Sequence, residues 1–94
     1  MPESCEVTVT VTVTLAGDLH ARPAGSLAVA AATFESAVEL TVGASRADAR
    51  SVLAVMGLGA TSGQQVTVRA AGPDAEKAVN TMIDILAEAT RVGG

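Results

Sequence analysis

The single histidine of the chain, His20, lies in the segment Leu19-His20-Ala21-Arg22-Pro23. Proline fits only the first turn of a helix, so the segment predicts a helix that begins close to His20 or Ala21. Free N–H groups and the positive end of the helix dipole bind phosphate at such a position. The Arg22 guanidinium can add charge-assisted hydrogen bonds to phosphate oxygens. Because a neutral imidazole is a competent nucleophile near pH 7, these residues predict a phosphohistidine that forms and transfers.

Other interpretations of His20 are open at this point. The plainest is a surface histidine at a helix start with no task. A metal site is disfavoured, because no second histidine or cysteine is placed to join it. A catalytic triad with Asp18 is conceivable, but the chain has no nucleophile elbow.

A second candidate is Ser51, in the segment Arg50-Ser51-Val52-Leu53-Ala54-Val55-Met56. Serine is a preferred helix N-cap, which alone explains its presence. It is also a plausible phosphorylation site, because negative charge is tolerated at a helix N-terminus. Val52, Leu53 and Met56 cannot all be buried on so short a helix, so we expect some of them to form an exposed apolar patch for a partner.

These candidates must be positioned by elements that the hydrophobic periodicity predicts. Val and Thr alternate from Val7 to Thr14, which is typical of a strand with one exposed face, and a helix follows from about Ala21 to Phe34. Further strands are expected at Val38–Val42, around Arg46–Asp48 and at Val66–Ala70, a short helix from Ser51 to Met56, and a last helix after Asp74, its expected N-cap, to Ala89. Four strands with helices on one face predict an α+β two-layer domain.

Composition narrows the classes of function. The 94 residues suit a single domain, 1–94, with residues 1–5 as a flexible tail. A net charge of −4 and an aromatic content of 1% disfavour nucleic-acid binding, which needs basic and stacking side chains. A lone Cys5, no signal peptide and no long apolar run predict a soluble cytoplasmic protein.

The motif LHARPA around His20 and the segment ARSVLAVMGLG around Ser51 resemble the histidine phosphocarrier protein (HPr) family of the bacterial phosphoenolpyruvate-dependent sugar phosphotransferase system. The resemblance extends from Val7 to Ala89. It implies an open-faced β-sandwich, a four-stranded antiparallel sheet with three helices on one face. It also implies a monomeric phosphoryl carrier, with no cofactor or metal and no catalytic pocket of its own. Asp18 departs from the family, where glycine is usual. Its carboxylate could repel phosphate or could hydrogen-bond the loop.

The resemblance assigns roles by position. His20 would accept phosphoryl on Nδ1 from phospho-enzyme I and donate it to sugar-specific IIA domains. Arg22 would balance the phosphate charge, and Ala21, Arg22 and Pro23 would line the phosphate site. Ser51 would match the serine modified by an HPr kinase/phosphorylase, and Val52, Leu53 and Met56 the surface that docks enzyme I, IIA domains and a transcriptional regulator. The alternatives are a regulatory module controlled through Ser51, and a carrier of a nitrogen-type or dihydroxyacetone-kinase system.

Overall fold

The computed structural model describes residues 7–19 and 21–89, which form four strands and three helices. In chain order these are β1 (Val7–Thr14), α1 (Ala21–Ala31), β2 (Ala37–Val42), β3 (Ser45–Asp48), α2 (Val52–Gly57), β4 (Gln65–Gly72) and α3 (Ala75–Ala89). Every element that the periodicity predicts is present. The α+β fold class is confirmed.

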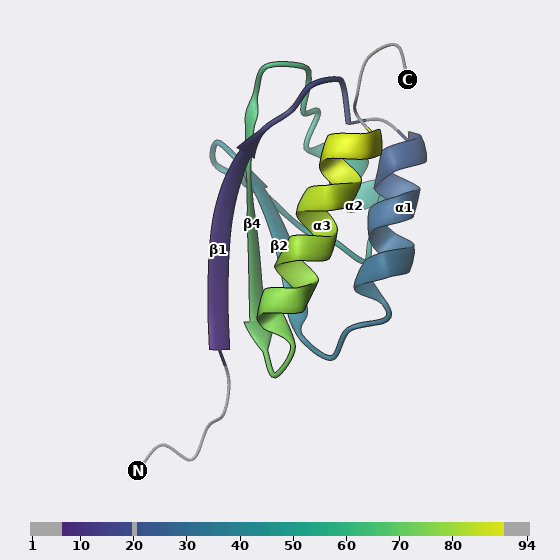
Figure 1. The fold of residues 1–94 in the computed structure, drawn as a ribbon. Coiled ribbons are helices and arrows are strands. Elements are labelled where there is room, and N and C mark those ends of the chain that lie inside the picture. Colours follow the sequence, from purple (N-terminus) through teal and green to yellow (C-terminus); the bar gives the residue numbers. More distant parts are fainter. Residues whose placement is uncertain (1–6, 20, 90–94) are drawn as a thin grey trace.

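The sheet has the strand order β1-β4-β2-β3, and all three neighbouring pairs are antiparallel. Helices α1 and α3 lie side by side over one face of the sheet, whereas α2 packs against α1 and β3 (Figure 1). The order places β4, which is late in the chain, between β1 and β2, with β1 and β3 at the two edges. This strand order requires long connections from β1 to β2 and from β3 to β4, and these connections contain α1 and α2.

The core lies between the sheet and the helices and is almost wholly aliphatic. Val66, Val68 and Ala70 of β4 are fully buried, because β4 is an interior strand beneath the helices. The valines of β1 do face this layer as predicted, but Val9, Val11 and Val13 are only half-buried and Val7 is 50% exposed. Their incomplete burial follows from the position of β1 at the sheet edge.

The first helix is shorter than the periodicity predicts, because it ends at Ala31 and not at Phe34. The Thr33 hydroxyl and the Thr33 N–H both donate to the Ala30 carbonyl, at 2.7 and 3.0 Å. These bonds close the last turn with the tighter spacing of three residues and satisfy a free carbonyl of the helix end. Phe34 still reaches the core from the loop and is half-buried.

The start of α3 is joined to the loop before β2. Asp74 stands immediately before α3, where an N-cap was predicted, and its carbonyl accepts the Ala78 N–H. Its carboxylate, however, accepts hydrogen bonds from the Glu35 N–H at 3.0 Å and from the Ser36 N–H at 2.9 Å, besides the Ser36 hydroxyl at 2.5 Å. The carboxylate therefore ties two distant segments together and lowers the free energy of the folded chain at their junction.

Candidate functional site

The predicted phosphoryl site lies at the start of α1. His20 itself falls outside the described residues, but the backbone is well held on both sides of it. Leu19 is buried, and its N–H donates to the Ala60 carbonyl at 3.0 Å. After His20, Pro23 and Ala24 are fully buried in the core. Both flanks of the histidine are thus anchored, so the site rests on a rigid scaffold.

The first turn of α1 has the electrostatic character that the sequence predicts. The helix begins at Ala21, and this turn carries no acidic residue to offset the positive end of its dipole. Pro23 lacks an N–H, and its buried ring fixes the turn. Arg22 is exposed, and no carboxylate among the described residues lies within ion-pair distance of it. Its guanidinium can therefore reach an anion brought to this surface.

Asp18 hydrogen-bonds a neighbouring loop. Its Oδ1 accepts the Ser62 N–H at 2.9 Å, and the Ser62 hydroxyl donates to the Ala16 carbonyl at 3.2 Å. The Gly63 N–H donates to the Leu15 carbonyl at 2.9 Å, which joins the same two loops. Of the two roles that the sequence left open for Asp18, the structure contains the hydrogen-bonded one. Sequence spacing could not show this contact, because the two residues are 44 positions apart.

The regulatory candidate, Ser51, is the N-cap of α2. Its hydroxyl accepts the Ala54 N–H at 3.1 Å, as the sequence predicts. The neighbouring Arg50 forms an ion pair with Asp48, in which Arg50 Nη2 and Asp48 Oδ2 are 3.2 Å apart. The hydrogen bond from the Arg50 side chain is the main reason that the pKa of Asp48 lies below its ordinary value. Ser51 is half-buried, so its hydroxyl keeps some access to solvent.

The three residues predicted to dock partners differ in exposure. Leu53 is 81% exposed and Met56 is 39% exposed, whereas Val52 is half-buried and packs against the core. One further residue was not predicted, namely Val29 of α1, which is 72% exposed. The signal that could have identified it is helical spacing. Val29 lies off the buried face of α1 and follows Arg22 by seven residues, which places both on one exposed side.

These side chains form an apolar surface on two adjoining helices. Of the four large hydrophobic residues exposed in the described part of the chain, three are Val29, Leu53 and Met56. The two helices that carry them, α1 and α2, pack against each other. We refer to Arg22, Val29, Leu53 and Met56 as the α1–α2 surface. Arg22 is its one charged member.

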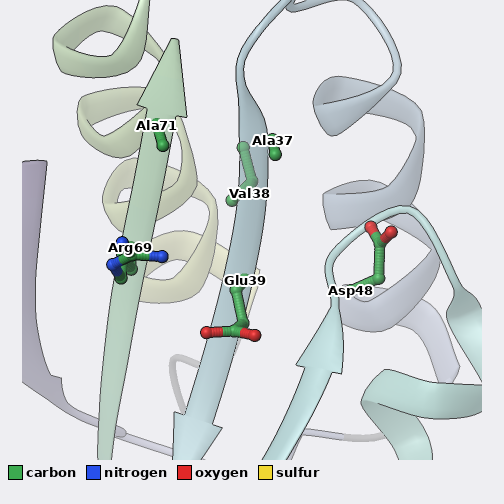
Figure 2. Close-up of a pocket in the computed structure, with 6 residues that line it drawn as sticks. All are labelled: Ala37, Val38, Glu39, Asp48, Arg69 and Ala71. Carbon is green, nitrogen blue, oxygen red and sulfur yellow. The ribbon is translucent and has the colours of Figure 1, made fainter. Parts of the chain in front are cut away.

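A shallow depression lies elsewhere, on the face of the sheet away from the helices. Figure 2 shows Arg69 and Glu39 on the neighbouring strands β4 and β2, with Asp48 at the end of β3. Ala37, Val38 and Ala71 complete its lining. The depression contains none of the predicted phosphoryl-site residues. Its carboxylates are partly compensated, because Arg46 lies 4.0 Å from Glu39 and Arg50 binds Asp48.

Neither a metal centre nor a membrane span is formed within residues 7–19 and 21–89. No three His, Cys, Asp or Glu side chains gather there closely enough to hold a metal ion. No helix of that part is long and apolar enough to cross a bilayer.

Comparisons with known proteins agree on one family. The family model described as the PTS HPr component phosphorylation site matches residues 7–88. The phosphocarrier protein HPr of Lysinibacillus sphaericus is 37% identical over 70 residues, which cover 74% of this chain and 80% of that protein.

Solved structures give the same result. The crystal structure of HPr-C-His from Thermoanaerobacter tengcongensis superposes with a TM-score of 0.76 at 28% identity, covering 94% of this chain and 98% of that one. The solution structure of Crh, the catabolite repression HPr of Bacillus subtilis, gives a TM-score of 0.70 at 32% identity, covering 87% and 98%. The sheet with three helices, the LHARPA segment at the start of α1 and these matches agree, and the chain belongs to the HPr family of phosphotransferase-system phosphocarriers.

Proposed function

We propose that this phosphocarrier accepts a phosphoryl group on His20 from phospho-enzyme I and donates it to the IIA domains of sugar permeases. One observation carries the proposal: α1 begins at Ala21, directly after His20 in sequence, with Arg22 exposed and without an ion-pair partner among the described residues. Helix N–H groups and a guanidinium are the groups that stabilise a phosphoryl anion.

The transfer needs little from the chain besides position and charge. The lone pair of a neutral His20 nitrogen forms the new N–P bond while the N–P bond of the donor breaks. The electron pair of that bond stays on the donor imidazole. The Arg22 guanidinium and the first turn of α1 stabilise the negative charge on the phosphoryl oxygens, as positively charged groups do in other phosphoryl transfers. A second transfer of the same kind passes the group to a IIA domain.

The test is labelling by enzyme I and phosphoenolpyruvate, followed by intact mass. The natural chain should gain one acid-labile phosphoryl group, and His20→Ala should gain none. Equal labelling of His20→Ala would exclude the proposal. Transfer from the labelled chain to a purified IIA domain then tests the second half of the cycle.

Arg22 is tested against an arginine that is exposed elsewhere. We expect Arg22→Ala to slow transfer by roughly ten- to a hundredfold, since a preorganised charge on the phosphoryl group is lost. Arg46→Ala is the matched control, because Arg46 is exposed and lies 4.0 Å from its nearest carboxylate. Both variants should keep the parent melting temperature. Similar transfer rates for the two variants would show that Arg22 has no specific role in phosphoryl transfer.

A second candidate function is regulation through Ser51, which the similarity to the catabolite repression HPr Crh favours. A phosphoryl group on Ser51 would stand at the start of α2 next to Arg50, which could turn from Asp48 to the new charge. We expect an HPr kinase with ATP to label the natural chain and not Ser51→Ala. An unlabelled natural chain would leave Ser51 as a helix cap only.

A further inference from the structure

The segment between β1 and α1 leads directly to His20 in the sequence, and both of its ends are held by the loop before β4. Leu15 exchanges two backbone hydrogen bonds with residues 63–64, each at 2.9 Å. At the other end of the segment, the Leu19 N–H donates to the Ala60 carbonyl at 3.0 Å. Both leucines are buried, so their side chains anchor the same two points in the core. The segment is therefore fixed where it starts and where it ends.

The middle of the segment depends on a single residue of the same loop, Ser62. Its N–H donates to Asp18 Oδ1 at 2.9 Å, and its hydroxyl donates to the Ala16 carbonyl at 3.2 Å. Within the part of the chain that the structure describes, residues 16–18 make no other hydrogen bond. Ser62 thus holds both exposed positions of the segment, and the second of them lies two residues before His20.

Ser62 belongs to a turn that forms without either of its two donors. The Gln64 N–H donates to the Thr61 carbonyl at 3.0 Å, and Gln64 Oε1 accepts the Thr61 N–H at 2.8 Å. Gly63 has a φ of +91°, which is typical of the third position of a type II turn, with Ser62 at the second. The N–H and the hydroxyl of Ser62 are therefore available to bind the segment that leads to His20.

We propose that Ser62 is a positioning residue for phosphoryl transfer, which acts on His20 by holding residues 16–18. This inference rests on the proposed function of His20 as the phosphoryl acceptor. Transfer needs the reacting nitrogen to be held in line with the phosphorus, and a displacement of about 1 Å can slow a reaction roughly a hundredfold. Pro23 and Ala24 fix the backbone that follows His20. Ser62 supplies the corresponding restraint on the backbone that precedes it.

The experiment is single-turnover transfer from phospho-enzyme I to the full chain, over a range of phospho-enzyme I concentrations. Ser62→Pro removes both donors at the turn position that proline favours, so the turn is kept. We expect its maximal transfer rate to fall roughly tenfold, with the half-saturating concentration unchanged, because positioning is lost and docking is not. Ser62→Ala keeps the N–H that binds Asp18 and should slow transfer by no more than about twofold.

Gln64→Ala is the matched control in the same turn. It removes the bond from Gln64 Oε1 to the Thr61 N–H and leaves every backbone and side-chain bond to residues 15–19 in place. We expect a small loss of melting temperature, as for Ser62→Pro, but the transfer rate of the parent. Equal slowing by Gln64→Ala and Ser62→Pro would show that the turn acts through stability alone. That result would overturn the proposal, as would an unchanged maximal rate for Ser62→Pro.

Asp18 gives a second test, from the other side of the bond and without any change in the turn. Asp18→Asn and Asp18→Ala both lack the charge, but only asparagine keeps an oxygen acceptor for the Ser62 N–H. We expect Asp18→Ala to transfer about three- to tenfold more slowly than Asp18→Asn. Equal rates would overturn the proposal even if Ser62→Pro does not fold. A natural chain that takes up no phosphoryl group would instead refute the proposed function, and this inference with it.

Discussion

At the residue scale, a carboxylate two positions before the expected phosphohistidine is the feature that most needs a physical explanation. Like charges repel, so Asp18 should oppose the arrival of a phosphoryl group. The structure offers a compensating benefit, because Asp18 Oδ1 accepts the Ser62 N–H and helps to hold the 15–19 loop. The same side chain therefore has an electrostatic cost and a structural gain, and substitutions can separate them.

Asp18→Asn retains an oxygen acceptor for Ser62 and removes the charge. Because the side chain is exposed and screened, we expect transfer from enzyme I to speed up only by about two- to threefold, with unchanged stability. Asp18→Ala also loses the hydrogen bond and should cost about 1 kcal/mol of unfolding free energy. Single-turnover transfer rates and urea unfolding measure the two effects. A slower Asn variant would show that the charge itself assists the reaction.

The Asp74 carboxylate predicts a pH dependence. The Ser36 hydroxyl chiefly, and the Glu35 N–H next, lower the pKa of Asp74 below its ordinary value. A lowered folded pKa means that Asp74 stabilises the fold above the unfolded pKa of about 3.9 and that this contribution is lost as pH falls through the folded pKa. We expect Asp74→Asn to be less stable than the parent at pH 7, with the difference shrinking in acid. Melting curves from pH 7 to about 2 check this, and a gap that stays constant over the range would contradict it.

At the element scale, a strand or helix was predicted correctly where its signal is a pattern among neighbouring residues. The alternation of Val7–Thr14 and the helical spacing in 75–89 are local patterns, and they predicted their elements correctly. Two other features do not follow from such patterns. The end of α1 depends on a hydrogen bond of the Thr33 hydroxyl, and the Asp74 carboxylate binds a loop that is 38 residues away in the sequence. The strand order could not follow from periodicity, because it is decided by packing between distant segments. The family resemblance implied a four-stranded antiparallel sheet without giving the order of its strands.

The turn from β4 into α3 gives the prediction at this scale. Gly72 has a φ of +150°, and a Cβ there would lie 2.6 Å from the Ser36 Cα. Gly72→Ala combines backbone strain with a clash against backbone, so we expect a loss of about 2–4 kcal/mol. Gly25→Ala is the control, since nothing lies near its Cβ and alanine favours helix α1 by up to about 1 kcal/mol. Urea unfolding measures both, and equal effects of the two variants would show that Gly72 is not constrained.

At the scale of the whole molecule, Asp18 precedes α1 by three residues, but the two helices that carry the surface we expect partners to use contain none of the ten acidic residues. Local features were predictable, namely the start of α1 within LHARPA and the cap at Ser51. The exposure of Val29, on a helix that packs against α2, was not predicted, because it depends on how distant parts of the chain fold together. Helical spacing could place Val29 on the exposed side of α1, but it could not show which helix packs beside that side.

This distribution of charge predicts how docking responds to salt and to substitution. Because the α1–α2 surface is apolar apart from Arg22, affinity of the unphosphorylated chain for enzyme I should change little between low and physiological salt. Leu53→Asp should weaken binding by about ten- to a hundredfold. Its melting temperature should stay near that of the parent, since Leu53 is 81% exposed. Val7→Asp is the matched control, because it places the same charge on an exposed valine of β1, away from α1. Titration calorimetry at two salt concentrations decides the matter: a steep loss of affinity with salt, or equal effects of the two variants, would mean that enzyme I docks elsewhere.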